Sequence, residues 1–154
     1  MHSAKLRPTL FTCVVAITAV SAFTTTTSVT LTGSEVRLVE ELTGFQSPSG
    51  NVGCYIGSHG VRCDIAERDW AQPPRPVDCP AFLSSGQGLQ IQDGVSSVVC
   101  AGDTALFDGA DTLPYGTAIR FGTVQCDSNE LAMTCRDTVT GHGFSLSRQS
   151  YQLF

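Results

Sequence analysis

The spacing of six cysteines is the feature that most constrains how this chain can fold. The chain contains seven cysteines, and Cys13 lies apart from the others in an apolar N-terminal stretch. The remaining six are Cys54, Cys63, Cys79, Cys100, Cys126 and Cys135. Zinc sites usually take cysteines in pairs roughly two to four residues apart, and no such pair or CxxC redox motif occurs here. An even number of widely spaced cysteines in an exported chain predicts three structural disulfides and no metal site.

We predict two β-hairpins, each of which contains one of these disulfides. Apolar residues alternate with small or polar ones on both sides of the glycine-containing turn at 57–60: Val52, Cys54, Ile56, Val61, Cys63 and Ile65. A register that sets Cys54 opposite Cys63 places all six on one face of the hairpin, at a distance that a disulfide can bridge. We therefore predict a Cys54–Cys63 bond.

The same cysteine pattern occurs a second time, 72 residues further along the chain. Both copies read G-[NT]-V-x-C-x8-C, the first starting at Gly50 and the second at Gly122. The second copy predicts a Cys126–Cys135 hairpin with its turn at 129–132 and with Met133 opposite Ser128. If both hairpin bonds form, only Cys79 and Cys100 are left to pair.

The N-terminal region resembles an export signal followed by a leash. Lys5 and Arg7 precede an apolar stretch of about 16 residues, shorter than the roughly 20 that a spanning helix needs. Small residues follow at 20–22, so we predict a signal peptide over 1–22, with retention as a membrane anchor as the alternative. Residues 23–43 are expected to form a flexible threonine-rich leash, in which the capping box at 32–35 favours a short helix.

Residues 44–154 are expected to form the folded, disulfide-rich β domain. Asp93-Gly94 predicts a type I′ hairpin turn, and the proline-rich segment 71–80 predicts an extended connection. A further strand is expected over 117–126, and a bulge or bend over 147–150 is expected to correct a slip in the alternation. These features predict an all-β, small antiparallel sandwich or partial barrel with roughly seven to nine strands.

Charge and composition narrow the range of partners. After residue 22 the chain carries seven arginines and 14 acidic residues, a net charge of −7. This acidic balance argues against nucleic acid and anionic membranes as partners. We expect a monomer with no cofactor and no stable membrane insertion after signal cleavage, whose partner is extracellular or in the cell envelope.

Three residues are candidates for a binding surface: Tyr115, His142 and Asp103. His142 lies between two glycines and can serve as base, acid or ligand, but the same string is typical of a tight turn. Tyr115 follows Leu-Pro and precedes Gly, where an exposed aromatic ring would favour an interface. No GxSxG motif or other catalytic set stands out. A Ser-His-Asp set could be composed of Asp103, His142 and one of many serines, but this freedom of choice makes it weak evidence.

Several strings together resemble a known family: FQSPSGN at 45–51, VRCDI at 61–65, LPYG at 113–116, and TGHGF at 140–144 followed by LSR at 146–148. They are similar to small, six-cysteine domains exported by actinobacteria of the mycobacterial type, whose function is not characterised. The resemblance covers about residues 45–154. It implies an exported β domain, and it implies no catalytic residues.

The sequence therefore favours a secreted or envelope-associated, non-catalytic binding module. One alternative is a small secreted hydrolase that uses His142 with a nearby carboxylate. Another is a structural protein of the cell envelope.

Overall fold

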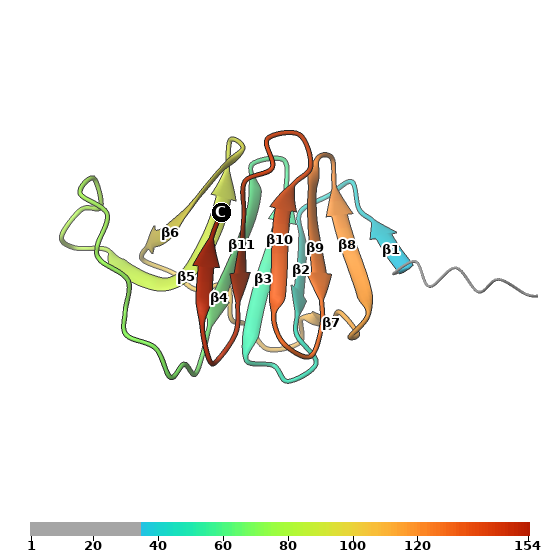
Figure 1. Cartoon of the computed structure of the whole chain (residues 1–154), viewed down its shortest axis with the longest axis horizontal. Coiled ribbons are helices and arrows are strands. Elements are labelled where there is room, and N and C mark those ends of the chain that lie inside the picture. Colours follow the sequence, from blue (N-terminus) through green and yellow to red (C-terminus); the bar gives the residue numbers. More distant parts are fainter. Residues whose placement is uncertain (1–34) are drawn as a thin grey trace, which may run out of the picture. The chain divides into compact units, whose positions relative to one another are not determined.

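Two six-stranded β-sheets make up the fold in the computed structural model, which describes residues 35–154 (Figure 1). No helix occurs within these residues, so the expected all-β sandwich is confirmed. In order across the first sheet, the strands are β1 (Glu35–Leu38), β8 (Thr117–Phe121), β9 (Val124–Ser128), β10 (Met133–Asp137), β11 (Gly143–Leu146) and β12 (Tyr151–Leu153). The second sheet contains β6 (Val95–Ala101), β5 (Ser84–Gln92), β4 (Gly60–Ile65), β3 (Val52–Gly57), β2 (Thr43–Gln46) and β7 (Asp111–Thr112). The predicted signal peptide and the first part of the leash lie outside the described residues.

Both predicted cysteine hairpins form in the expected register. In β3–β4, Cys54 lies opposite Cys63, and in β9–β10, Cys126 lies opposite Cys135. The structure contains disulfides between these partners and a third between Cys79 and Cys100. The three bonds are the pairs that the cysteine spacing predicts.

The two hairpin disulfides lie in the centre of the core, one on each sheet. The Sγ atoms of Cys63 and Cys135 are 3.9 Å apart, and all four hairpin cysteines are fully buried. Large apolar side chains from both sheets surround them, including Phe45, Ile119 and Phe144. Sulfur thus fills the middle of the sandwich, where the inward positions of both hairpins meet.

The sequence repeat corresponds to an approximate internal symmetry of the fold. Each sheet contains a five-stranded antiparallel meander, β2 to β6 in one and β8 to β12 in the other. The first cysteine of each repeat has an equivalent partner on the preceding strand. Cys54 lies opposite Phe45 in the second sheet, and Cys126 lies opposite Ile119 in the first. The equivalent cysteines Cys63 and Cys135 are in contact with each other in the core.

The two halves exchange their edge strands. β1 precedes β2 in the chain but pairs in parallel with β8, and β7 precedes β8 but pairs in parallel with β2. Arg37 lies opposite Ile119 and Asp111 lies opposite Phe45, so these two charged residues occupy equivalent positions. They form an ion pair with each other at 3.4 Å.

The exchange explains why the expected short helix is wrong. A capping box is a local signal, whereas Glu35–Leu38 pairs with Thr117–Arg120, a strand 82 residues away. Strand pairing therefore begins at Glu35, whereas the β domain was expected to begin at residue 44. Two strand pairings, β1 with β8 and β2 with β7, are parallel, whereas an antiparallel fold was expected.

Two further expectations are corrected by tight turns. The strand expected over 117–126 is divided into β8 and β9 by a turn at 122–123, where Gly122 has a positive φ of 54°. The bend expected over 147–150 is a full reversal between β11 and β12, closed by the Ser147 N–H donating to the Ser150 carbonyl at 2.9 Å. With these reversals and the edge strands β1 and β7, residues 35–154 contain 12 strands. The Asp93-Gly94 turn is confirmed, because both residues have positive φ.

Residues 102–110, which we call the strap, cross the outer face of the second sheet. They connect β6 to β7, which lie at opposite edges of that sheet. The strap passes over Gly53, where a Cβ atom would lie 2.5 Å from the Ala105 carbonyl oxygen. It also passes over Gly44, which faces the ring of Phe107. Glycine is needed at Gly53 because the strap's backbone occupies the space of a side chain.

Candidate functional site

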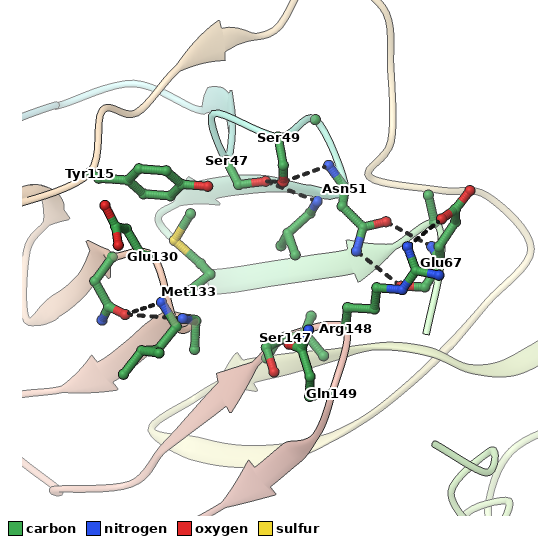
Figure 2. Close-up of a pocket in the computed structure, with 17 residues that line it drawn as sticks. Ser47, Ser49, Asn51, Glu67, Tyr115, Glu130, Met133, Ser147, Arg148 and Gln149 are labelled. Carbon is green, nitrogen blue, oxygen red and sulfur yellow. Dashed lines mark hydrogen bonds and ion pairs between the residues drawn. The ribbon is translucent and has the colours of Figure 1, made fainter. Parts of the chain in front are cut away.

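A hollow of about 520 Å³ lies where loops from both sheets meet at one end of the sandwich. The β2–β3 turn, the segment after β4, the β7–β8 turn, the β9–β10 turn and the β11–β12 turn all contribute to it. Its labelled residues in Figure 2 are Ser47, Ser49, Asn51, Glu67, Tyr115, Glu130, Met133, Ser147, Arg148 and Gln149. Loops held by a rigid scaffold are the usual place for a binding site in a β-sandwich.

The hollow has an apolar floor and a polar rim. Val52, Met133 and Leu146 are buried and form the floor, and Figure 2 shows the Met133 side chain toward the Tyr115 end of the hollow. Tyr115 lies at one end of the rim and the Glu67–Arg148 pair lies at the other. A ligand in this hollow would therefore meet apolar surface below and polar groups on either side.

Several polar groups of the rim form hydrogen bonds that hold its turns. Asn51 donates through Nδ2 to the Glu67 carbonyl at 2.9 Å and accepts the Glu67 N–H through Oδ1 at 2.8 Å. Asn129 Oδ1 accepts the N–H groups of Leu131 and Ala132, which closes the β9–β10 turn. These internal bonds give the loops a defined shape before any ligand binds.

Arg148 joins two acidic residues at the other end of the rim. Its guanidinium lies 3.0 Å from Glu67 Oε2 and 3.4 Å from Asp69 Oδ2. All three side chains are at least half exposed, so these ion pairs contribute little to stability. Two carboxylates for one guanidinium leave this end of the hollow with an excess of negative charge.

The three residues predicted for a binding surface have different surroundings. Tyr115 is 43% exposed and lines the hollow. Asp103 belongs to the strap and pairs with Arg62, and His142 contacts the β5–β6 turn. Neither Asp103 nor His142 lines the hollow that Tyr115 lines.

Arg62 clasps the strap to the second sheet. Its guanidinium lies 2.7 Å from the buried Asp64 and 2.6 Å from the exposed Asp103, and Asp64 also accepts the Ala105 N–H. Burial alone would lower the pKa of Arg62, but hydrogen bonds to both carboxylates more than offset it and raise the pKa. The hydrogen bond and charge of Arg62 lower the pKa of Asp103. Asp103 thus has a structural partner that holds its carboxylate.

His142 ties two hairpin turns together. Its Nδ1 lies 2.8 Å from the Gly94 carbonyl oxygen, which can only accept, so Nδ1 carries the proton. Asp137 accepts the N–H groups of Val139 and Thr140, and these bonds lower the pKa of its carboxyl group. The string around His142 therefore forms the tight turn that was one of its two sequence interpretations.

A second, more apolar groove of about 430 Å³ lies near the β3–β4 turn. Leu42, Tyr55 and Phe121 contribute apolar surface, and His59 lies on its rim. Within the described part of the chain, no group of three or more His, Cys, Asp or Glu residues is arranged to hold a metal ion. The same residues include no helix that could cross a membrane.

Comparison with known proteins places the chain in a family. The model of a family of unknown function, DUF6636, matches residues 28–154, which include every strand of both sheets. The chain belongs to this family. No curated protein and no solved structure matches it. Membership in DUF6636 confirms the expected kind of family, one of unknown function, while the actinobacterial origin and the export remain predictions.

The sequence alone pointed to one residue of the hollow, Tyr115, and not to most of the other residues that line it. Tyr115 was found because an aromatic residue in a Pro-Tyr-Gly turn is expected to be exposed. Glu130 gave no signal, because an isolated charged residue in a turn is typical of any solvated surface. Three of the resemblance strings, at 45–51, 113–116 and 146–148, lie in segments that line the hollow and could have pointed to it.

Proposed function

We propose that this chain is an exported, non-catalytic binding domain of the cell surface or extracellular space, and that it binds its partner through the hollow at the loop end of the sandwich. The observation that carries the proposal is the convergence of five loop segments on one hollow with an apolar floor. A disulfide-held scaffold suits an oxidising compartment and fixes these loops.

Retention on isolated cell walls of the encoding organism tests this proposal. Gln149 lines the hollow, and replacing it by tryptophan would fill part of that space. Gln152 is also an exposed glutamine, but it lies on β12 outside the hollow, so Gln152→Trp is the matched control. We expect the walls to retain the unaltered protein and Gln152→Trp, and to retain Gln149→Trp at least about tenfold more weakly.

Two results would count against the proposal. If Gln149→Trp is retained as well as the control, the hollow is not the binding site. If even the unaltered protein is not retained, binding to the envelope is excluded. Intact mass spectrometry of the native protein tests export, because a chain that begins near residue 23 and gains six hydrogens on reduction is expected outside the cell.

A further inference from the structure

The chemistry of the hollow's partner can be read from the groups that the hollow leaves unpaired. Among residues 35–154, the Glu130 carboxylate forms no ion pair, and the Tyr115 hydroxyl and the Glu130 carboxylate take part in no side-chain hydrogen bond. Tyr115 and Glu130 line the same hollow and are both labelled in Figure 2. An aromatic ring next to a free carboxylate is a typical setting for an ammonium or guanidinium group.

Two hydrogen-bonded turns hold the backbone at Tyr115 and Glu130. Tyr115 lies in the β7–β8 turn, which is closed by Thr117 Oγ1 donating to the Pro114 carbonyl at 2.7 Å. The Gly116 N–H donates to the Ser128 carbonyl at 2.8 Å and so joins this turn to the start of the β9–β10 turn that carries Glu130. The backbone of both residues is therefore fixed before a cation binds, so that binding has to order only the two side chains.

The remainder of the hollow favours a cation on an apolar stem. Met133 lies on the floor between Tyr115 and the opposite rim, where the methylene groups of a long side chain can pack. Arg148 already contacts Glu67 and Asp69, so it offers little attraction to an anionic ligand. The net charge of −7 after residue 22 would also steer a basic partner toward the domain.

From this geometry we infer that the hollow binds a lysine or arginine side chain of a peptide or protein partner, with the cation between Glu130 and Tyr115 and its stem over Met133. The inference rests on the proposed function, because it names the partner of the same hollow. It makes Glu130 and Tyr115 the residues that determine specificity.

Titrations of the isotopically labelled full domain with short probes, followed by NMR, test the inference. The probes are capped tripeptides with glycine on either side of lysine, arginine or norleucine, together with the neutral trisaccharide maltotriose. We expect the lysine and arginine peptides to shift the amide signals of Gly116 and Leu131 saturably, with a Kd of about 1 mM or tighter. Norleucine has the apolar stem without the charge, so its peptide should bind at least about tenfold more weakly.

Three variants locate the interaction. Glu130→Gln should weaken lysine-peptide binding about tenfold, and Tyr115→Leu should weaken it by a similar factor, because each removes one side of the cation site. Tyr115→Phe keeps the aromatic ring and should retain most of the affinity. Glu41→Gln removes an exposed acidic group outside the hollow and should leave binding unchanged.

The possible outcomes separate this inference from the proposed function. Equal binding of the norleucine and lysine peptides, no saturable shift with either basic peptide, or unchanged affinity in Glu130→Gln would overturn the cation site. Saturable shifts at Gly116 and Leu131 with maltotriose alone would overturn it as well, yet would leave the hollow as the binding site. Conversely, lysine-dependent binding with no retention on cell walls would support the cation site and reject the envelope as the location of the partner.

Discussion

The Sγ atoms of Cys63 and Cys135 touch at 3.9 Å across the centre of the sandwich, although the two residues are 72 positions apart in the chain. Each belongs to a disulfide within its own hairpin, so the two bonds pack against each other as core side chains. The equivalent positions of two sequence repeats thus meet at the point where the two sheets are packed together.

This contact predicts which disulfides matter most for stability. The chain-entropy model assigns about 3 kcal/mol to each bond, with slightly more for Cys79–Cys100 because its loop is longer. Replacing Cys126 and Cys135 by alanine also leaves a void in the fully buried core. We therefore expect this double variant to lose more unfolding free energy than the Cys79→Ala/Cys100→Ala variant, as measured by urea denaturation. The opposite order would show that loop entropy outweighs core packing.

The clasp between the strap and the second sheet predicts a strong effect at Arg62. Replacing Arg62 by methionine would leave the buried Asp64 without its cation, and losses of about 3–5 kcal/mol are typical in such cases. The Arg62→Met/Asp64→Asn double variant should recover part of this loss, because no unpaired charge remains. Urea denaturation of both variants measures the difference. Equal stability of the single and double variants would mean that the charge of Asp64 is not the cause.

Unfolding should depend on pH through Asp103 and Asp137. The hydrogen bond to Arg62 lowers the pKa of Asp103, and the Thr140 and Val139 N–H groups lower the pKa of Asp137. Since both folded-state values lie below the unfolded value of about 3.9, the stabilisation is complete above that pH and is lost as pH falls through the folded-state pKa. The destabilising effect of Asp103→Asn on the urea midpoint should therefore be largest near pH 7 and shrink below about pH 4. A difference that stays constant over this range would contradict the assignment.

Two glycines under the strap should differ in their tolerance of a methyl group. A Cβ at Gly53 would meet the backbone of Ala105 and Leu106, whereas a Cβ at Gly44 would meet only the ring of Phe107, which is 45% exposed. Gly53→Ala should therefore cost about 1–3 kcal/mol of unfolding free energy and speed hydrogen exchange at the Ala105 amide. Gly44→Ala should cost less than about 1 kcal/mol, because the ring can rotate away. Similar losses in both variants would show that the strap is not held tightly over Gly53.

Local patterns in the sequence were sufficient where the partners lie close in the chain. Alternating apolar residues and a fixed cysteine interval determine the register of Cys54 with Cys63 and of Cys126 with Cys135. Positive φ at Asp93 and Gly94 follows from the Asp-Gly turn between two strand-forming runs. These predictions succeed because the energy that decides them comes from neighbouring residues.

The same reasoning failed where a distant partner decides the structure. The capping box before Val36 favours a helix, but β8 provides backbone hydrogen bonds that convert the segment into an edge strand. Likewise, Gly122 in an apparently continuous strand gave no indication that β8 and β9 form a hairpin. Whether an isolated glycine continues or reverses a strand depends on the sheet that receives the next segment.

Apart from Tyr115, the candidate site belongs to this second category. Nothing in the sequence relates Tyr115 to Glu130, because they lie in two turns separated by two strands. The sequence by itself determined the strand-forming runs, two local hairpins and the disulfide pairs, since side-chain alternation and cysteine spacing act over a few residues. Only the tertiary structure decided the exchange of β1 and β7, the strap over Gly53 and the hollow between the loops. These features arise from packing two sheets against each other, and packing depends on residues far apart in the chain.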